Sequence, residues 1–256
     1  MPTLYFKNVS GDDWGTLANW FTNAAATTPA VAIPWAVNNA YKDYDLAFAT
    51  GVTVSVLAGA NSGSESIGNG FTITGTCSIP VILGYDDSES PSTVTVFGGT
   101  YSASVIAGYA TISGGTFQNT LTNQGYSTIT AGTFQGAVIN SYTNLEITGG
   151  TFQNTVAFNA DTAVSGGTFN GNVNLNNAGG GSGITGGQFN SGFTQTAGNI
   201  SGGTFNGTFT RVSGNVTGGT FHNGILNQFY RNGFPPPIVF TGYNPNALDV
   251  LGTGMV

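Results

Sequence analysis

Short runs of alternating apolar and polar residues recur along most of the chain, separated by glycine, asparagine and serine. The segment 112–121, ISGGTFQNTL, shows the unit: a β-branched residue, a hydroxyl residue, two glycines, then Thr-Phe, and a further apolar residue four places on. Alternation over a few residues predicts short strands, and the glycine and asparagine steps predict turns. The pattern therefore predicts an all-β chain with its β-branched and aromatic side chains facing inward.

One aromatic residue marks each copy of this unit. The aromatic positions lie 16 to 20 residues apart, and each is followed four places later by another apolar residue. The predicted aromatic core column is Tyr101, Phe117, Phe134, Phe152, Phe169, Phe189, Phe205 and Phe221. The apolar residues that follow are Val105, Leu121, Val138, Val156, Val173, Phe193, Phe209 and Ile225. A fixed period of this length is typical of a solenoid.

Each copy predicts one coil of three short strands. The Gly-Gly pair can adopt positive φ and turns the chain sharply. A single coil cannot bury its apolar residues, but stacked coils can, with each aromatic ring against the next at the ~4.8 Å spacing of paired strands. We therefore expect a parallel β-solenoid of roughly eight coils. A β-sandwich or barrel is the alternative, and it would not require the repeated phrase.

The repeat divides the chain into three regions. Residues 1–96 lack the phrase and hold all three tryptophans, so we interpret them as an N-terminal cap or attachment module with irregular first coils. Residues 97–233 form the predicted solenoid. Residues 234–256 are interpreted as a C-terminal cap, because Pro235–Pro237 supply no N–H groups to extend a ladder.

Composition and charge exclude several classes of function. The net charge is −7 with four basic residues, whereas a nucleic-acid binder needs clustered Lys and Arg. The single cysteine, Cys77, allows no intrachain disulfide and no Cys-rich metal site. No apolar run approaches the ~20 residues of a membrane helix, and the first residues show no basic and apolar leader. We expect no cofactor, no metal, no membrane insertion and no signal peptide in this sequence.

The repeated [IV]-[ST]-G-G-T-F phrase resembles the right-handed parallel β-helices of tailed-phage fibres, tail spikes and related virion appendages, and more weakly those of bacterial adhesins. The resemblance covers residues 97–233. It implies a structural protein of a virion or extracellular appendage, of the tail-fibre or capsid-decoration type. It also implies a homo-oligomer, with a trimer favoured, that contacts other virion proteins through residues 1–96.

Candidate catalytic groups are few. Some phage spikes of this fold cleave polysaccharide, and glycoside hydrolysis needs two carboxylates held close together. Glu146 and Asp161 are the acidic residues of the coils, and they fall in successive turns. Two solvated surface carboxylates are the simpler interpretation. His222 is the only histidine, and no nucleophile motif accompanies it. We expect no enzymatic activity, with a polysaccharide-degrading spike as the alternative.

Three tyrosines are candidates for binding. Tyr109, Tyr126 and Tyr142 fall at nearly equivalent positions of three consecutive coils. If they point outward, their rings form a column against which sugar rings of a host surface glycan can stack. If they point inward, they belong to the core. The sequence leaves both alternatives open.

Threonine columns raise a further alternative, because regular threonine arrays on solenoids resemble those of ice-binding proteins. One column precedes the aromatic residues, and a second lies across the glycine turn. The first is Thr116, Thr133, Thr151, Thr168, Thr204 and Thr220; the second is Ser113, Thr130, Thr148, Ser165, Thr185, Ser201 and Thr217. Gln188 interrupts the first column, and threonine is in any case common at outward strand positions.

Overall fold

The structure is a computed structural model of the 256-residue chain, and it describes the repeat region almost continuously. The described residues are 3–6, 17–23, 25–31, 36–38, 43–45, 52–56, 65–67, 71–73, 76–77, 81–83, 94–96, 98–142, 144–176, 183–223 and 225–227. The expected C-terminal cap, residues 234–256 with Pro235–Pro237, lies outside them.

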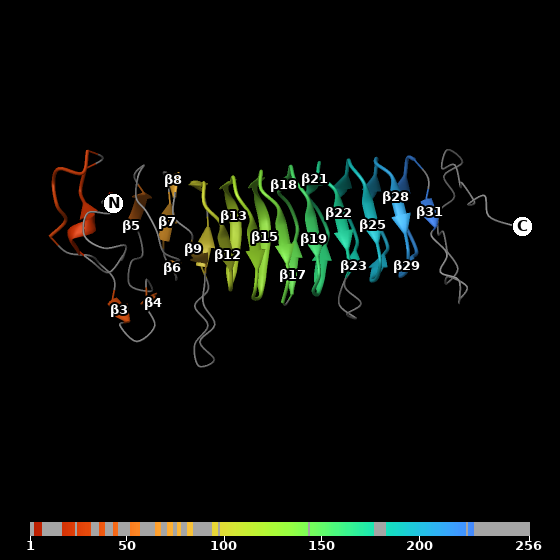
Figure 1. Cartoon of the computed structure of the whole chain (residues 1–256), viewed down its shortest axis with the longest axis horizontal. Helices are drawn as coiled ribbons and strands as arrows, with labels where there is room; N and C mark the ends of the chain where they lie inside the picture. The colour runs from red at the N-terminus through yellow and green to blue at the C-terminus, as the bar shows by residue number, and fades with distance from the viewer. Residues whose placement is uncertain are drawn as a thin grey trace, which may run out of the picture.

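The described residues form an all-β solenoid, which confirms the predicted fold class. Parallel strands from successive coils lie side by side along the long axis of the molecule (Figure 1). About seven turns separate Tyr101 from Phe221. The helical content of the described residues is one 3-10 turn, η1 (Leu17–Asn19).

Each coil contributes one strand to each of three faces, which are numbered 1 to 3 in chain order from the strand that precedes the glycine pair. Face 3 is a 12-stranded sheet whose strands carry the apolar residue that follows the aromatic one. Its strands are β3 (Ala36–Asn38), β4 (Asp43–Asp45), β6 (Glu65–Ile67), β9 (Val81–Leu83), β12 (Val105–Ala107), β14 (Leu121–Asn123), β16 (Val138–Asn140), β19 (Val156–Phe158), β22 (Val173–Leu175), β25 (Phe193–Gln195), β28 (Phe209–Arg211) and β31 (Ile225–Asn227).

Faces 1 and 2 belong to one 15-stranded sheet, because β13 (Ala110–Phe117) and β15 (Ser127–Phe134) run through the corner between them. Face 1 precedes the glycine pair, and face 2 carries Thr-Phe. The other strands of face 1 are β10 (Val94–Val96), β17 (Leu145–Ile147), β20 (Thr162–Val164), β23 (Gly183–Ile184), β26 (Asn199–Ile200) and β29 (Asn215–Val216). Those of face 2 are β8 (Thr76–Cys77), β11 (Thr100–Tyr101), β18 (Thr151–Phe152), β21 (Thr168–Phe169), β24 (Gln188–Phe189), β27 (Thr204–Phe205) and β30 (Thr220–Phe221).

The ladders extend to the N-terminal side of residue 97. In face 3, β9 pairs in parallel with β12, β6 with β9, and β4 with β6, while β3 pairs antiparallel with β4. A separate four-stranded sheet has the order β2 (Trp20–Phe21), β1 (Thr3–Phe6), β5 (Val52–Val56) and β7 (Phe71–Ile73). The boundary near residue 96 stays a prediction, and the face 3 ladder runs across it.

A column of stacked aromatic rings occupies the interior. The eight aromatic residues from Tyr101 to Phe221 are at most 5% exposed, and neighbouring rings stack with centroids 4.5 to 4.9 Å apart. The register aligns them coil on coil, as in the pair Phe134 and Phe152. Strand spacing therefore sets the ring spacing.

The corner between faces 1 and 2, here called the glycine corner, brings the backbones of successive coils into contact. Gly150, the second glycine of its pair, has φ of 96°, a conformation that favours glycine. A Cβ on Gly149, the first glycine, would lie 2.1 Å from the carbonyl oxygen of Thr130 in the preceding coil. The first position accepts Ala131 in the phrase ITAGTF, where the β13–β15 ladder shifts register.

Candidate functional site

The chain passes from face 3 to face 1 of the next coil at a second corner, here called the return corner. Tyr109, Tyr126 and Tyr142 lie there and point outward: Tyr126 is 56% exposed, Tyr142 is 73% exposed, and Tyr109 is half-buried. The rings of Tyr109 and Tyr126 are 5.8 Å apart and inclined by 40°. The outward alternative therefore holds, and these three residues define the aromatic corner.

Strand register corrects the expected equivalence of the three tyrosines. Ser127 pairs with Leu145, and the N–H of Ser127 donates to the carbonyl oxygen of Asn144 at 3.2 Å. Asn144, and not Tyr142, therefore occupies the position of Tyr126 in the next coil. Tyr142 lies two residues earlier, because it follows Tyr126 by 16 residues whereas the paired residues Ser127 and Leu145 are 18 apart, one more than in the neighbouring coils.

The column of the return corner continues into the following coil. Leu145 pairs with Thr162, and the N–H of Leu145 donates to the carbonyl oxygen of Asp161 at 3.0 Å. Successive coils thus place Tyr109, Tyr126, Asn144 and Asp161 at one position of the return corner. A half-buried ring, an exposed ring, an amide and a carboxylate follow one another along the solenoid.

Close backbone contact fixes the aromatic corner. Gly125 is buried, and a Cβ on it would lie 1.7 Å from the carbonyl oxygen of Gly108 in the preceding coil. The side chain of Asn123, itself fully buried, donates from Nδ2 to the carbonyl oxygen of Gly125 at 2.7 Å. Tyr126 therefore follows a backbone segment that is held from beneath by the preceding coil and from inside by a buried amide.

A second buried amide, that of Asn140, links the return corner of this coil to the return corner of the following coils. Asn123 Nδ2 also donates to Oδ1 of Asn140 at 2.8 Å. Asn140, fully buried, donates in turn to the carbonyl oxygen of Asp161 at 2.8 Å and to Oγ1 of Thr162 at 2.9 Å. Buried polar groups must find partners inside the fold, and these side chains partner the inward-turned backbone carbonyls of the return corner.

In later coils, longer buried side chains donate to the backbone carbonyls of the return corner. Gln195, fully buried, donates from Nε2 to the carbonyl oxygens of Gly198 and Asn215 at 3.0 and 3.3 Å. Arg211 is 2% exposed and donates from Nε and Nη2 to the carbonyl oxygen of Gly214. Burial lowers the pKa of the Arg211 guanidinium, because desolvation disfavours its charged form.

Sequence reasoning missed these buried polar residues. Asn123, Asn140, Gln195 and Arg211 each lie six places after the aromatic residue of their coil. Position six has the same strand parity as the inward apolar residue at position four, so alternation alone indicates an inward side chain. That parity is the signal that could have found them.

Two shallow hollows lie on the return-corner side of the solenoid. The first, of about 300 Å³, is lined by Gln124, Ser141 and Tyr142. The second, of about 250 Å³, is lined by Asn144, Leu145, Glu146, Asp161, Thr162 and Ala163. Pockets that enclose a small ligand measure roughly 300–1,000 Å³. The first hollow is at the lower end of this range and the second is below it, and both are open to the surface, so a ligand would lie across them.

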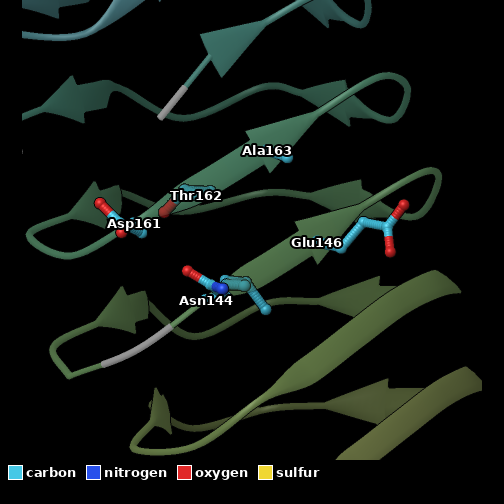
Figure 2. A pocket seen from close by; sticks show the side chains of 6 residues that line it. Asn144, Glu146, Asp161, Thr162 and Ala163 are labelled. Carbon is cyan, nitrogen blue, oxygen red and sulfur yellow. The ribbon is translucent and has the colours of Figure 1, made fainter. Parts of the chain in front are cut away.

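The second hollow contains the two carboxylates that the sequence singled out. Figure 2 shows Asp161 and Asn144 at one end of two neighbouring strands and Glu146 at the other, with its carboxylate directed away from Asp161. In the register Asp161 is level with Asn144, while Glu146 is level with Ala163. The two carboxylates share a hollow but do not converge on one point.

The remaining candidates for chemistry are dispersed. His222 is exposed at the corner between β30 and β31. Among the described residues, no three His, Cys, Asp or Glu side chains group so that they could hold a metal ion. The described segments also contain no helix long and apolar enough to cross a membrane.

The threonine column of face 2 is in register. Thr116 pairs with Thr133, Thr133 with Thr151, and Thr151 with Thr168, before Gln188 takes the next position and Thr204 and Thr220 follow. These threonines are half-buried by their neighbours. Across the glycine corner, Thr130 Oγ1 donates to Ser113 Oγ at 3.2 Å, which links two members of the second column.

Comparison of the chain with protein families, with curated proteins and with solved structures found no match.

Proposed function

We propose that this chain is a non-enzymatic structural protein of a virion or another surface appendage, of the tail-fibre or capsid-decoration type, and that it binds surface glycans. The observation that carries the proposal is the unbroken stack of parallel coils around one aromatic column. Strand ladders on three sides and stacked rings within make a stiff rod. A stiff, weakly charged rod is suited to spacing and display.

The placement of Glu146 and Asp161 supports a non-enzymatic role over a polysaccharide-degrading spike. Glycosidases place two carboxylates on either side of one scissile bond. Here the side chain of Glu146 points away from Asp161 (Figure 2). The hollow that they share is shallow and lies open on the surface of the solenoid.

The aromatic corner supports glycan binding. Tyr126 and Tyr142 are among the few large apolar side chains that are exposed in the described part of the chain. Tyrosine offers a rigid, amphipathic surface that loses little conformational entropy when it is covered. Amide and hydroxyl side chains beside the rings, Gln124 and Ser141, match the hydrogen-bonding groups of sugars.

Two measurements on the purified full chain test the proposal. Light scattering gives the mass in solution, and we expect a homo-oligomer, with three chains favoured by the resemblance. An array of immobilised neutral and acidic glycans then tests binding. An oligomer that binds glycans supports a receptor-binding appendage. A monomer counts against the appendage, and an array without any bound glycan counts against the glycan-binding role.

Ice binding is a second candidate, which the in-register threonine column of face 2 favours. Thr116, Thr133, Thr151 and Thr168 repeat at the strand spacing without interruption. Growth of ice crystals in the presence of the protein tests it. Thr151→Val would abolish an inhibition that depends on this column, and inhibition that Thr151→Val does not change would exclude the column as its cause.

A further inference from the structure

The return corner offers a ligand the same kind of contact once per coil. The Tyr109 and Tyr126 rings are neighbours, and the next two coils present Asn144 and Asp161 at the equivalent position. These positions repeat along the solenoid at the ~4.8 Å spacing of paired strands. An extended oligosaccharide repeats its sugar rings at a similar spacing, so its long axis can run parallel to the solenoid axis.

The tyrosine rings and the polar side chains along this line have different roles. The exposed rings of Tyr126 and Tyr142 are available to stack on the C–H faces of sugars, and Gln124 and Ser141 line the adjoining hollow with Tyr142. Buried Asn123 and backbone contact with Gly108 hold the segment before Tyr126 in place. A preorganised surface loses less entropy on binding, which favours affinity.

The charges near the corner select the class of sugar. Asp161 stands on the line of contacts, and Glu146 lines the same hollow with its carboxylate directed away from Asp161. Arg211, the one Lys or Arg among the described residues, is buried three coils beyond Asp161. A carboxylated or sulfated sugar placed there meets like charge. Hydroxyl and amide N–H groups of a neutral sugar can instead donate to Asp161.

We propose that the aromatic corner binds an extended neutral oligosaccharide along the solenoid axis, with successive sugars on successive coils, and that Asp161 excludes acidic sugars. Tyr109, Tyr126 and Tyr142 supply the stacking surfaces, and Asn144 and Asp161 accept or donate hydrogen bonds at the far end. This inference rests on the glycan-binding role proposed above and adds the orientation and charge class of the ligand.

The test uses the full chain and β-1,4-linked N-acetylglucosamine oligomers from disaccharide to hexasaccharide, with hyaluronan oligomers as the acidic probe. Saturation-transfer NMR and calorimetry measure contact and affinity. We expect affinity to rise with length until the oligomer spans the corner, and Tyr126→Ala and Tyr142→Ala each to weaken binding by about five- to tenfold through the loss of one stacked ring. Gln153→Ala, an exposed position on another corner, is the matched control and should bind normally.

Asp161→Asn tests charge selection separately. We expect it to admit the hyaluronan oligomers while the neutral oligomers still bind. Glycan binding that does not depend on length, on the tyrosines or on Asp161 would overturn this inference and leave the glycan-binding role standing. Binding of no glycan, either by these probes or on the array, would overturn both.

Discussion

The glycine corner and the return corner both turn the chain sharply, but they do so in different ways. At the glycine corner every coil from Gly99 to Gly219 uses a glycine at positive φ, and nearly the same six-residue phrase surrounds it. At the return corner the sequence is less regular: AGYAT, NQGYST and NSYTNLE occupy successive coils, and only later do AGNI and SGNV place Gly198 and Gly214 at positive φ. Backbone contact between coils occurs at both corners, at Gly149 and at Gly125, but it recurs with nearly the same phrase only at the glycine corner. At the return corner the sequence varies with the side chains that partner its inward carbonyls.

The difference follows from what each corner has inside it. The glycine corner encloses the aromatic column, so its geometry must repeat at the ring spacing. The return corner encloses whichever side chain stands six places after the aromatic residue, and this is Asn140 in one coil, Phe158 in the next and Arg211 further on. Variation at the return corner leaves room for a binding surface, whereas variation at the glycine corner would interrupt the rod.

The largest expected effect comes from removing one ring of the column. Phe152→Ala leaves a cavity between the stacked rings of Phe134 and Phe169, and the substitution should cost about 3–5 kcal/mol of unfolding free energy. Denaturant unfolding followed by circular dichroism measures it. Phe152→Leu, which keeps most of the volume, should lose less. Equal stability of Phe152→Ala and the unmodified chain would be incompatible with the column.

A substitution at the glycine corner should follow in size. Gly149→Ala places a Cβ 2.1 Å from the carbonyl oxygen of Thr130, so the backbone must shift, at the upper end of the roughly 1–3 kcal/mol of overpacked sites. Gly98→Ala is the matched control, because no atom of the described residues, its chain neighbours aside, lies within 4 Å of its Cβ. Melting temperatures should fall for the first variant only. A similar fall in both would show that contact between coils is not the cause.

Substitutions at the return corner should reduce stability less, and the loss should come from its buried amides. Asn140→Ala removes one donor to the Asp161 carbonyl, one donor to Thr162 Oγ1 and the side-chain acceptor of the buried Asn123 amide, which should cost about 1–3 kcal/mol. Urea midpoints compare it with Gln153→Ala on the surface. If both midpoints are unchanged, the inward amides do not stabilise the corner.

The fold could be predicted because its cause is local and repeated. One aromatic residue per period, two glycines before it and an apolar residue four places after it define the coil, and the strand spacing then determines how the coils stack. The buried Asn123 and Arg211 could not be recognised by residue type, since amides and guanidinium groups are usually exposed. Each donates to a backbone carbonyl, of Gly125 and of Gly214, and such a partner leaves no mark in the sequence.

The candidate site could be predicted in part. The three tyrosines were found from their spacing, but spacing alone could not decide whether they point in or out. It also could not place the additional residue of the coil that contains Tyr142, so Asn144 was missed as the equivalent of Tyr126. Insertions within a corner change the register without disturbing the repeated phrase, and only strand pairing locates them.

Tyr126→Ala should have the smallest effect on stability. Its thermal unfolding, measured beside that of Phe152→Ala, is the most direct test of the difference between the two regions. Both changes remove one aromatic ring, the first from the return corner and the second from the core column. Surface substitutions usually stay within about 0.5 kcal/mol, so Tyr126→Ala should melt with the unmodified chain while Phe152→Ala melts far lower. Comparable losses of melting temperature in both variants would contradict the division between a core column that determines the shape of the rod and a return corner that is free to bind.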